Sequence, residues 1–153
     1  MKKRWHWEIK IPILTLVYFV IMIGSGMFKS CFFLFMIISF HEMCHCIAAT
    51  LLKMKVEAIT IYPFGMQANI QNLGFYSSFK ELIVLIAGPM THLINPFIFA
   101  FLLNLGVISP SMQSWLLNIN KGMLIMNLLP IYPLDGGRII NEIIHLFFPY
   151  SIS

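Results

Sequence analysis

The stretch CFFLFMIISFHEMCHCIAATLL, residues 31–52, places ionisable side chains inside an apolar segment long enough to span a bilayer. On a helix, His41 and His45 are four residues apart and share a face, so their imidazoles can bind one Zn²⁺ ion. Glu42 is close enough to act as a base toward a water molecule at that ion. By itself the five-residue pattern occurs by chance in many helices that bind no metal. In hydrocarbon these side chains are costly, so their placement there indicates a functional site.

The composition is that of an integral membrane protein. Of the 153 residues, 59% are hydrophobic and 10% are charged, whereas about a quarter of a typical soluble domain is charged. The net charge is +4, but the basic residues are scattered at the ends of apolar segments, which indicates membrane topology and not nucleic-acid binding. The three cysteines lie in or beside one apolar segment and predict no disulfide framework.

The apolar segments predict four to five transmembrane helices. The expected spans are residues 11–28, 31–52, about 82–105, 114–129 and a partial or interfacial helix at 139–148. The third span is expected to be interrupted at Gly88-Pro89. Residues 56–70 are β-branched and partly alternating, with a break at Pro63-Phe64-Gly65, which predicts a short β-hairpin between the second and third spans. The predicted fold class is an all-α, multi-span membrane protein with this hairpin.

The distribution of lysine and arginine predicts the orientation. With a cytoplasmic N-terminus, nearly all basic residues fall on the inner side, and Lys29 lies in an outer loop. Residues 1–10 are basic and aromatic and suit the headgroup layer. We therefore expect a multi-pass protein of the cell membrane whose active site opens to the cytoplasm. Residues 41–45 and Asp135 then share one depth in the inner half of the bilayer.

A catalytic zinc ion needs a third protein ligand, and Asp135 is the best-placed candidate. It follows a Pro-rich break, and Gly136-Gly137 allow the backbone to approach another helix closely. Asp135 also suits the N-cap of the segment that follows it. The other candidates for a third ligand are His92, Glu142, His145 and the cysteines.

Several further residues are candidates for a supporting or substrate-binding role. Asn127 and Pro130 suit the lining of a cytoplasm-facing water channel, and Asn127 equally suits a hydrogen bond between helices. His92 either packs in the third span beside a polar partner or supports the site, as a hydrogen-bond donor to a metal ligand or as a stabiliser of the oxyanion. Phe64 and Gly65 form either a substrate gate or a simple turn. A strand edge here can hold an unwound substrate in an extended form.

These motifs together resemble the site-2 protease family of intramembrane zinc metalloproteases. The matching segments are HEMCH (41–45), PFG (63–65), AGP (87–89) followed by His92, and NLLPIYPLDGGR (127–138). Their order and spacing are most similar to the stage IV sporulation protease branch, which activates a membrane-tethered sigma-factor precursor. The resemblance implies one zinc ion held by His41, His45 and Asp135, with Glu42 as the catalytic base.

The function expected from residues and resemblance is that of an intramembrane zinc metalloendopeptidase that cleaves a membrane-associated or transmembrane protein. The alternative is a non-catalytic membrane pseudoprotease or metal-binding scaffold that sequesters a client. The expected partners are such a protein, the lipid bilayer and inhibitory membrane proteins, with no nucleic acid. Residues 1–153 are expected to form a single membrane-embedded core domain without the paired regulatory CBS motifs of its relatives, as a compact variant or a fragment.

Overall fold

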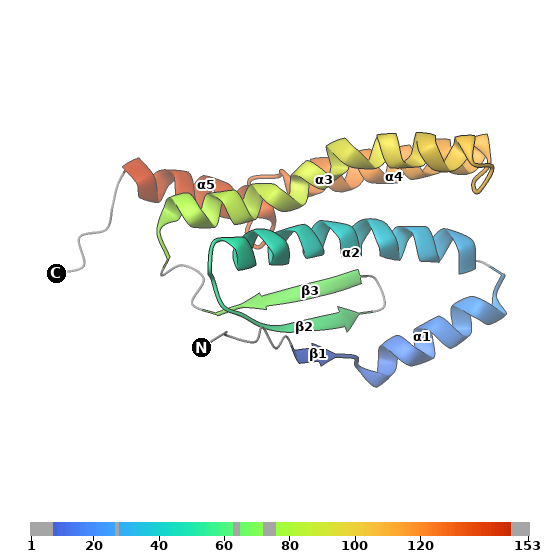
Figure 1. The fold of residues 1–153 in the computed structure, drawn as a ribbon, viewed down its shortest axis with the longest axis horizontal. Coiled ribbons are helices and arrows are strands. Elements are labelled where there is room, and N and C mark those ends of the chain that lie inside the picture. The colour runs from blue at the N-terminus through green and yellow to red at the C-terminus, as the bar shows by residue number, and fades with distance from the viewer. Residues whose placement is uncertain (1–7, 27, 63–64, 72–75, 148–153) are drawn as a thin grey trace. The chain divides into compact units, whose positions relative to one another are not determined.

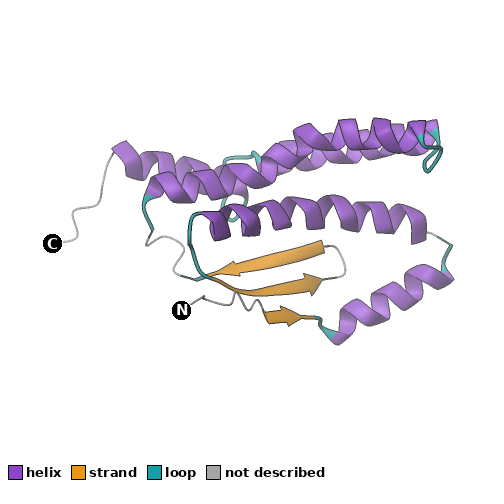
Figure 2. Ribbon diagram, viewed as in Figure 1, coloured by secondary structure: helices purple, strands orange, loops and turns teal. Residues whose placement is uncertain are grey.

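The computed structural model describes residues 8–26, 28–62, 65–71 and 76–147, which form five helices and one small sheet (Figure 1). Helices dominate, and the strands lie between the second and third helices except for one short strand near the N-terminus (Figure 2). This confirms a mostly helical chain with a small sheet. The chain divides into two compact units, residues 1–73 and 74–153, and each is described by itself.

The first unit combines two helices with a three-stranded sheet. Its elements are β1 (Glu8–Lys10), α1 (Ile13–Gly24), α2 (Phe28–Leu51), β2 (Val56–Tyr62) and β3 (Gly65–Ile70). The strand order is β1-β2-β3, and β2 and β3 are antiparallel, as the alternation of residues 56–70 predicts. The short parallel strand β1 is an addition that the sequence did not predict.

Two contacts cover the outer edge of β2. β1 pairs with it from Glu8 opposite Ala58 to Lys10 opposite Thr60. One residue further along β2, the Thr15 hydroxyl of α1 donates a hydrogen bond of 2.9 Å to the carbonyl of Ile61. The strand β3 therefore forms the other edge of the sheet.

α2 packs against β3, and a glycine sets how closely they approach. A Cβ atom at Gly65 would collide with the side chain of Ile38 in α2, and Gly65 also has a φ of +142°. Both conditions exclude other residues at this position. The start of β3 is thereby held against the middle of α2.

α2 ends in a Schellman motif, in which one residue adopts a left-handed conformation. Lys53 has a φ of 61°; its N–H donates to Thr50 O at 3.0 Å, and Met54 N–H donates to Ala49 O at 2.9 Å. The side chains of Met54 and Ala49 are fully buried, which is the apolar contact usual in this motif.

The second unit is built on α3 (Ser78–Asn104), which packs against both α4 (Pro110–Asn127) and α5 (Asp135–Phe147). α4 begins four residues before the predicted start. Ser109 accepts a hydrogen bond of 3.2 Å from Met112 N–H, and Pro110 fits the first helical position. The expectation of an interruption at Gly88-Pro89 is wrong, because α3 continues through Pro89 and Pro96.

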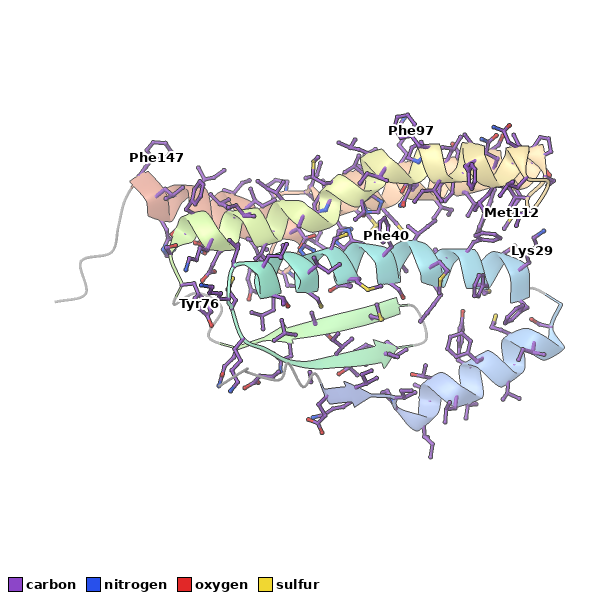
Figure 3. All side chains as sticks on the ribbon, viewed as in Figure 1. Lys29, Phe40, Tyr76, Phe97, Met112 and Phe147 are labelled. Carbon is purple, nitrogen blue, oxygen red and sulfur yellow. The ribbon has the colours of Figure 1, made fainter. Side chains whose placement is uncertain are left out.

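α2 and α3 are long and apolar enough to cross a membrane. α1 is apolar but has only 12 residues, about 18 Å of helix, against a hydrocarbon core of about 30 Å. Large apolar side chains project from the helices: Phe97 and Phe147 have 77% and 75% of their surfaces exposed (Figure 3). Such a surface suits contact with lipid.

Candidate metal centre

His41 and His45 form a preorganised pair on the buried side of α2. Their Nε2 atoms are 3.1 Å apart, and the two rings meet edge to face with centroids 4.8 Å apart. Two nitrogens bound to one tetrahedral zinc ion at the usual bond length lie about 3.3 Å from each other. The distance also suits a hydrogen bond between a protonated and an unprotonated nitrogen. The pair therefore fits a cation that takes both nitrogens.

The helical repeat of α2 separates this pair from a more exposed face. Both histidines are buried, as are Cys46 and Ala49, whereas Met43 and Ile47 of the same helix are exposed. Glu42, the predicted catalytic base, is partly exposed beside His41. One helix thus carries both imidazoles and the carboxylate in the order that the HEMCH motif requires.

Asp135 lies in the second unit, where it is the first residue of α5 and partly buried. The helix N-terminus favours a negatively charged side chain at this position. Before it, the backbone makes a turn in which Leu134 N–H donates to Ile131 O at 2.9 Å. The first helical bond of α5 then runs from Arg138 N–H to Leu134 O at 3.1 Å.

The two glycines after Asp135 are required by this close backbone packing. A Cβ atom at Gly136 would collide with backbone atoms of Leu128 and Leu129, and one at Gly137 with those of Ile131 and Tyr132. Backbone atoms cannot move aside as a flexible side chain can. The Gly-Gly pair therefore lets the connection after α4 lie directly on the start of α5.

A buried polar cluster joins α3 to α4. His92 Nδ1 lies 2.8 Å from Asn120 Oδ1, Asn95 Nδ2 donates to the same oxygen at 2.8 Å, and Asn120 Nδ2 donates to the His92 carbonyl at 2.8 Å. The sequence motifs indicated His92 but not Asn120. Pro96, four residues after His92, was an available signal, because it leaves the His92 carbonyl without its helical donor.

The remaining predicted residues occupy varied positions. Asn127 is the last residue of α4 and is half-buried, and Pro130 is exposed in the connection to α5. Gly65 begins β3 against α2, as described above, and Phe64 lies outside the described residues. Glu142 is buried on α5.

Comparison with known proteins identifies the chain's relatives. The profile of peptidase family M50 matches residues 30–112, more than half of the chain. Stage IV sporulation protein FB of Bacillus subtilis is 28% identical over 145 residues, which cover 94% of this chain and 50% of that protein. Zinc metalloprotease MJ0392 of Methanocaldococcus jannaschii is 27% identical over 157 residues, covering 95% of this chain and 45% of that protein.

This chain therefore spans about half the length of these curated relatives. Among solved structures, the site-2 protease from Methanocaldococcus jannaschii matches with a TM-score of 0.65 and 25% identity, covering 98% of this chain and 73% of that one. These matches confirm the resemblance that the motifs predicted, and the chain belongs to peptidase family M50, the site-2 protease family.

Proposed function

We propose that this chain is the core of an intramembrane zinc endopeptidase that cleaves membrane-associated or transmembrane proteins. The observation that carries the proposal is the pair of buried Nε2 atoms 3.1 Å apart on a helix long and apolar enough to span a membrane. Membership of peptidase family M50 supports a proteolytic use of that pair.

The proposed cofactor is one zinc ion held by His41, His45 and Asp135. Each of these residues offers one ligand atom of a type that zinc accepts. Two imidazoles and a carboxylate match the three-ligand set of catalytic zinc sites, which keep a fourth position open. When bound, the ion activates water and polarises the carbonyl of the scissile peptide bond.

Glu42 is the proposed general base. It takes a proton from the attacking water and returns it to the nitrogen of the leaving amine, so that the two transfers balance over one cycle. It follows His41 directly and is partly exposed, so water can reach it. Asn127 and Pro130 are proposed to line the route of water and substrate.

The sheet offers a way to hold the substrate in an extended form. A transmembrane helix hides its peptide bonds, so the cleaved stretch must unwind before attack. β1 and Thr15 occupy the outer edge of β2, and β1 offers only three residues, so β3 is the longer edge strand and the proposed site of strand addition. Gly65 starts β3 against Ile38, and His41 is only three residues, about 4.5 Å along the helix axis, beyond Ile38. Gly65 would then meet the substrate near His41, and Phe64, which lies outside the described residues, is proposed to take part in substrate binding with it.

We further propose four to five membrane spans, a cytoplasmic N-terminus, and residues 1–153 working as one catalytic core. Two candidate spans and the family together indicate a membrane protein. Similarity to Stage IV sporulation protein FB makes a membrane-tethered sigma-factor precursor the first substrate to test.

The test is a cleavage assay on purified protein with a panel of membrane-tethered substrates, together with metal analysis. Glu42→Gln is expected to keep its zinc and lose cleavage by at least about a thousandfold, because the base that accepts the water proton is gone. Glu57→Gln, which changes an exposed glutamate on β2, serves as the matched control and should cleave like the wild type. Equal cleavage by Glu42→Gln and wild type, or zinc-loaded wild type that cleaves nothing while binding a client, would favour the scaffold alternative.

A further inference from the structure

We infer that His92, Asn95 and Asn120 form a positioning cluster that fixes the rotation of α4 and thereby the direction of Asn127. This inference rests on the proposed function, in which Asn127 faces water or substrate. It assigns a role to three residues on two helices, and none of the three is proposed to touch the metal.

The cluster begins with a break in the hydrogen bonding of α3. Pro96 has no N–H, so the carbonyl of His92, four residues earlier, lacks its usual helical donor. Asn120 Nδ2 of α4 supplies that donor at 2.8 Å. A bond to the main chain of α3 fixes both the height and the rotation of α4, because the carbonyl cannot rotate as a side chain can.

The rest of the cluster fixes the amide group of Asn120. Its nitrogen donates to a carbonyl, so Oδ1 is the acceptor, and it receives bonds from Asn95 Nδ2 and from His92 Nδ1. His92, Asn95 and Asn120 are 2%, 3% and 4% exposed. Water is therefore a poor substitute for any of these partners, and the arrangement has one favoured geometry.

Helix geometry carries this constraint to the end of α4. Asn127 follows Asn120 by seven residues, so the two side chains leave the helix within about 20° of the same direction, about 10 Å apart along the axis. A rotation of α4 that broke the cluster would turn Asn127 by the same angle. The connection that leads to Asp135 starts directly after Asn127.

The experiment uses two asparagines of α4 as a matched pair. Asn120→Ala removes the buried amide, and Asn118→Ala removes an exposed amide on the opposite side of the same helix. We expect Asn120→Ala to lower kcat by at least about tenfold, with KM and zinc content unchanged, because small misplacements of a positioned group reduce turnover strongly. Asn118→Ala should match the wild type.

A double-mutant cycle separates positioning from a general loss of stability. If Asn120 acts through Asn127, Asn120→Ala should have almost no further effect in an Asn127→Ala background. His92→Asn keeps an N–H donor near the position of Nδ1 and should retain most activity, whereas His92→Phe should behave like Asn120→Ala. Multiplicative losses in the cycle, or equal losses in His92→Asn and His92→Phe, would overturn the inference.

A second readout works without cleavage. The rate of maleimide modification of Asn127→Cys reports how that position is presented, and it should change several-fold when Asn120→Ala is added but not when Asn118→Ala is added. Unchanged modification in both would reject the positioning role even if Asn120→Ala is too unstable for kinetics. A wild type that cleaves no substrate would refute the proposed function, while the modification rates would still test the cluster.

Discussion

The two long apolar helices, α2 and α3, satisfy their buried polar side chains in different ways. In α3, His92 and Asn95 bond to Asn120 of α4, and the Thr91 hydroxyl donates to Gly88 O at 2.7 Å. In α2, two imidazole nitrogens face each other at 3.1 Å. The polar groups of α3 thus bond to partners within the protein, whereas the histidine pair on α2 is the one that we propose to share a zinc ion.

The buried hydroxyl groups show the same contrast. Among the described residues, Ser39 Oγ and Thr50 Oγ1 are buried without a hydrogen-bond partner, and both belong to α2. A buried polar group without a partner costs about 1–3 kcal/mol. α2 therefore tolerates unfavourable polar burial, as helices that carry functional sites often do, whereas the buried Thr91 hydroxyl of α3 has a hydrogen-bond partner.

The largest effects should come from the proposed metal ligands on α2 and from Asp135. His45→Ala and Asp135→Asn are each expected to reduce bound zinc to background and abolish cleavage, because two ligands hold the ion poorly. His145→Ala, which removes another candidate ligand, should keep the metal. Metal content after dialysis against a chelator distinguishes these cases. Loss of zinc in His145→Ala with retention in Asp135→Asn would reassign the third ligand.

The next largest effect tests the architecture of the second unit. Gly136→Ala places a methyl group against the backbone of Leu128 and Leu129 and should destabilise the fold by about 3 kcal/mol. Gly122→Ala adds a Cβ atom at an α4 position where that atom would meet no other part of the protein within 4 Å. It should leave the stability unchanged or raise it by up to about 1 kcal/mol. Thermal unfolding in detergent compares the two. Equal shifts would show that the backbone contact is not tight.

A smaller pair of opposite effects tests the hydroxyl groups directly. Ser39→Ala should stabilise the protein by about 1 kcal/mol, since it removes an unpartnered buried hydroxyl. Thr91→Ala should destabilise by about 1 kcal/mol, because it removes a bonded one. The sign of the change in unfolding free energy is the measurement. Two changes of the same sign would remove this distinction between α2 and α3.

The smallest effects concern the ends of the two helices, where the same Schellman motif occurs. α2 uses Lys53 at a φ of 61°, and α3 uses Gly106 at 71°. Lys53→Gly should stabilise by about 0.5–1 kcal/mol, and Gly106→Lys should destabilise by about the same amount, because only glycine adopts this conformation without strain. Urea titration in mild detergent measures both. A destabilised Lys53→Gly would mean that the lysine side chain contributes more than the strain costs.

Local patterns in the sequence predicted much of the fold. Alternation in residues 56–70 predicted the β2–β3 hairpin, and the Pro- and Gly-rich stretch 127–138 predicted the break between α4 and α5. The histidine pair followed from a spacing of four on a helix. Each of these signals lies within a dozen or so residues, so a short stretch of sequence is enough to predict the feature.

Features that depend on distant partners were missed. β1 has three residues and pairs with a strand about 50 positions later, so no local pattern marks it. α3 was expected to break at its proline-containing stretch, but it continues, and the donor for the carbonyl freed by Pro96 comes from Asn120, 28 residues beyond His92. The number of spans rests on packing and length in the bilayer, which residue periodicity does not fix.

The covering of β2 by β1 and Thr15 limits how this sheet can grow. A sheet with two open edges can recruit neighbouring copies without end and so form fibres. β1 replaces the seven-residue edge that β2 would otherwise present with a strand of only three residues. This short edge begins and ends with a charged side chain, Glu8 and Lys10, and both features oppose pairing with the strand of another copy.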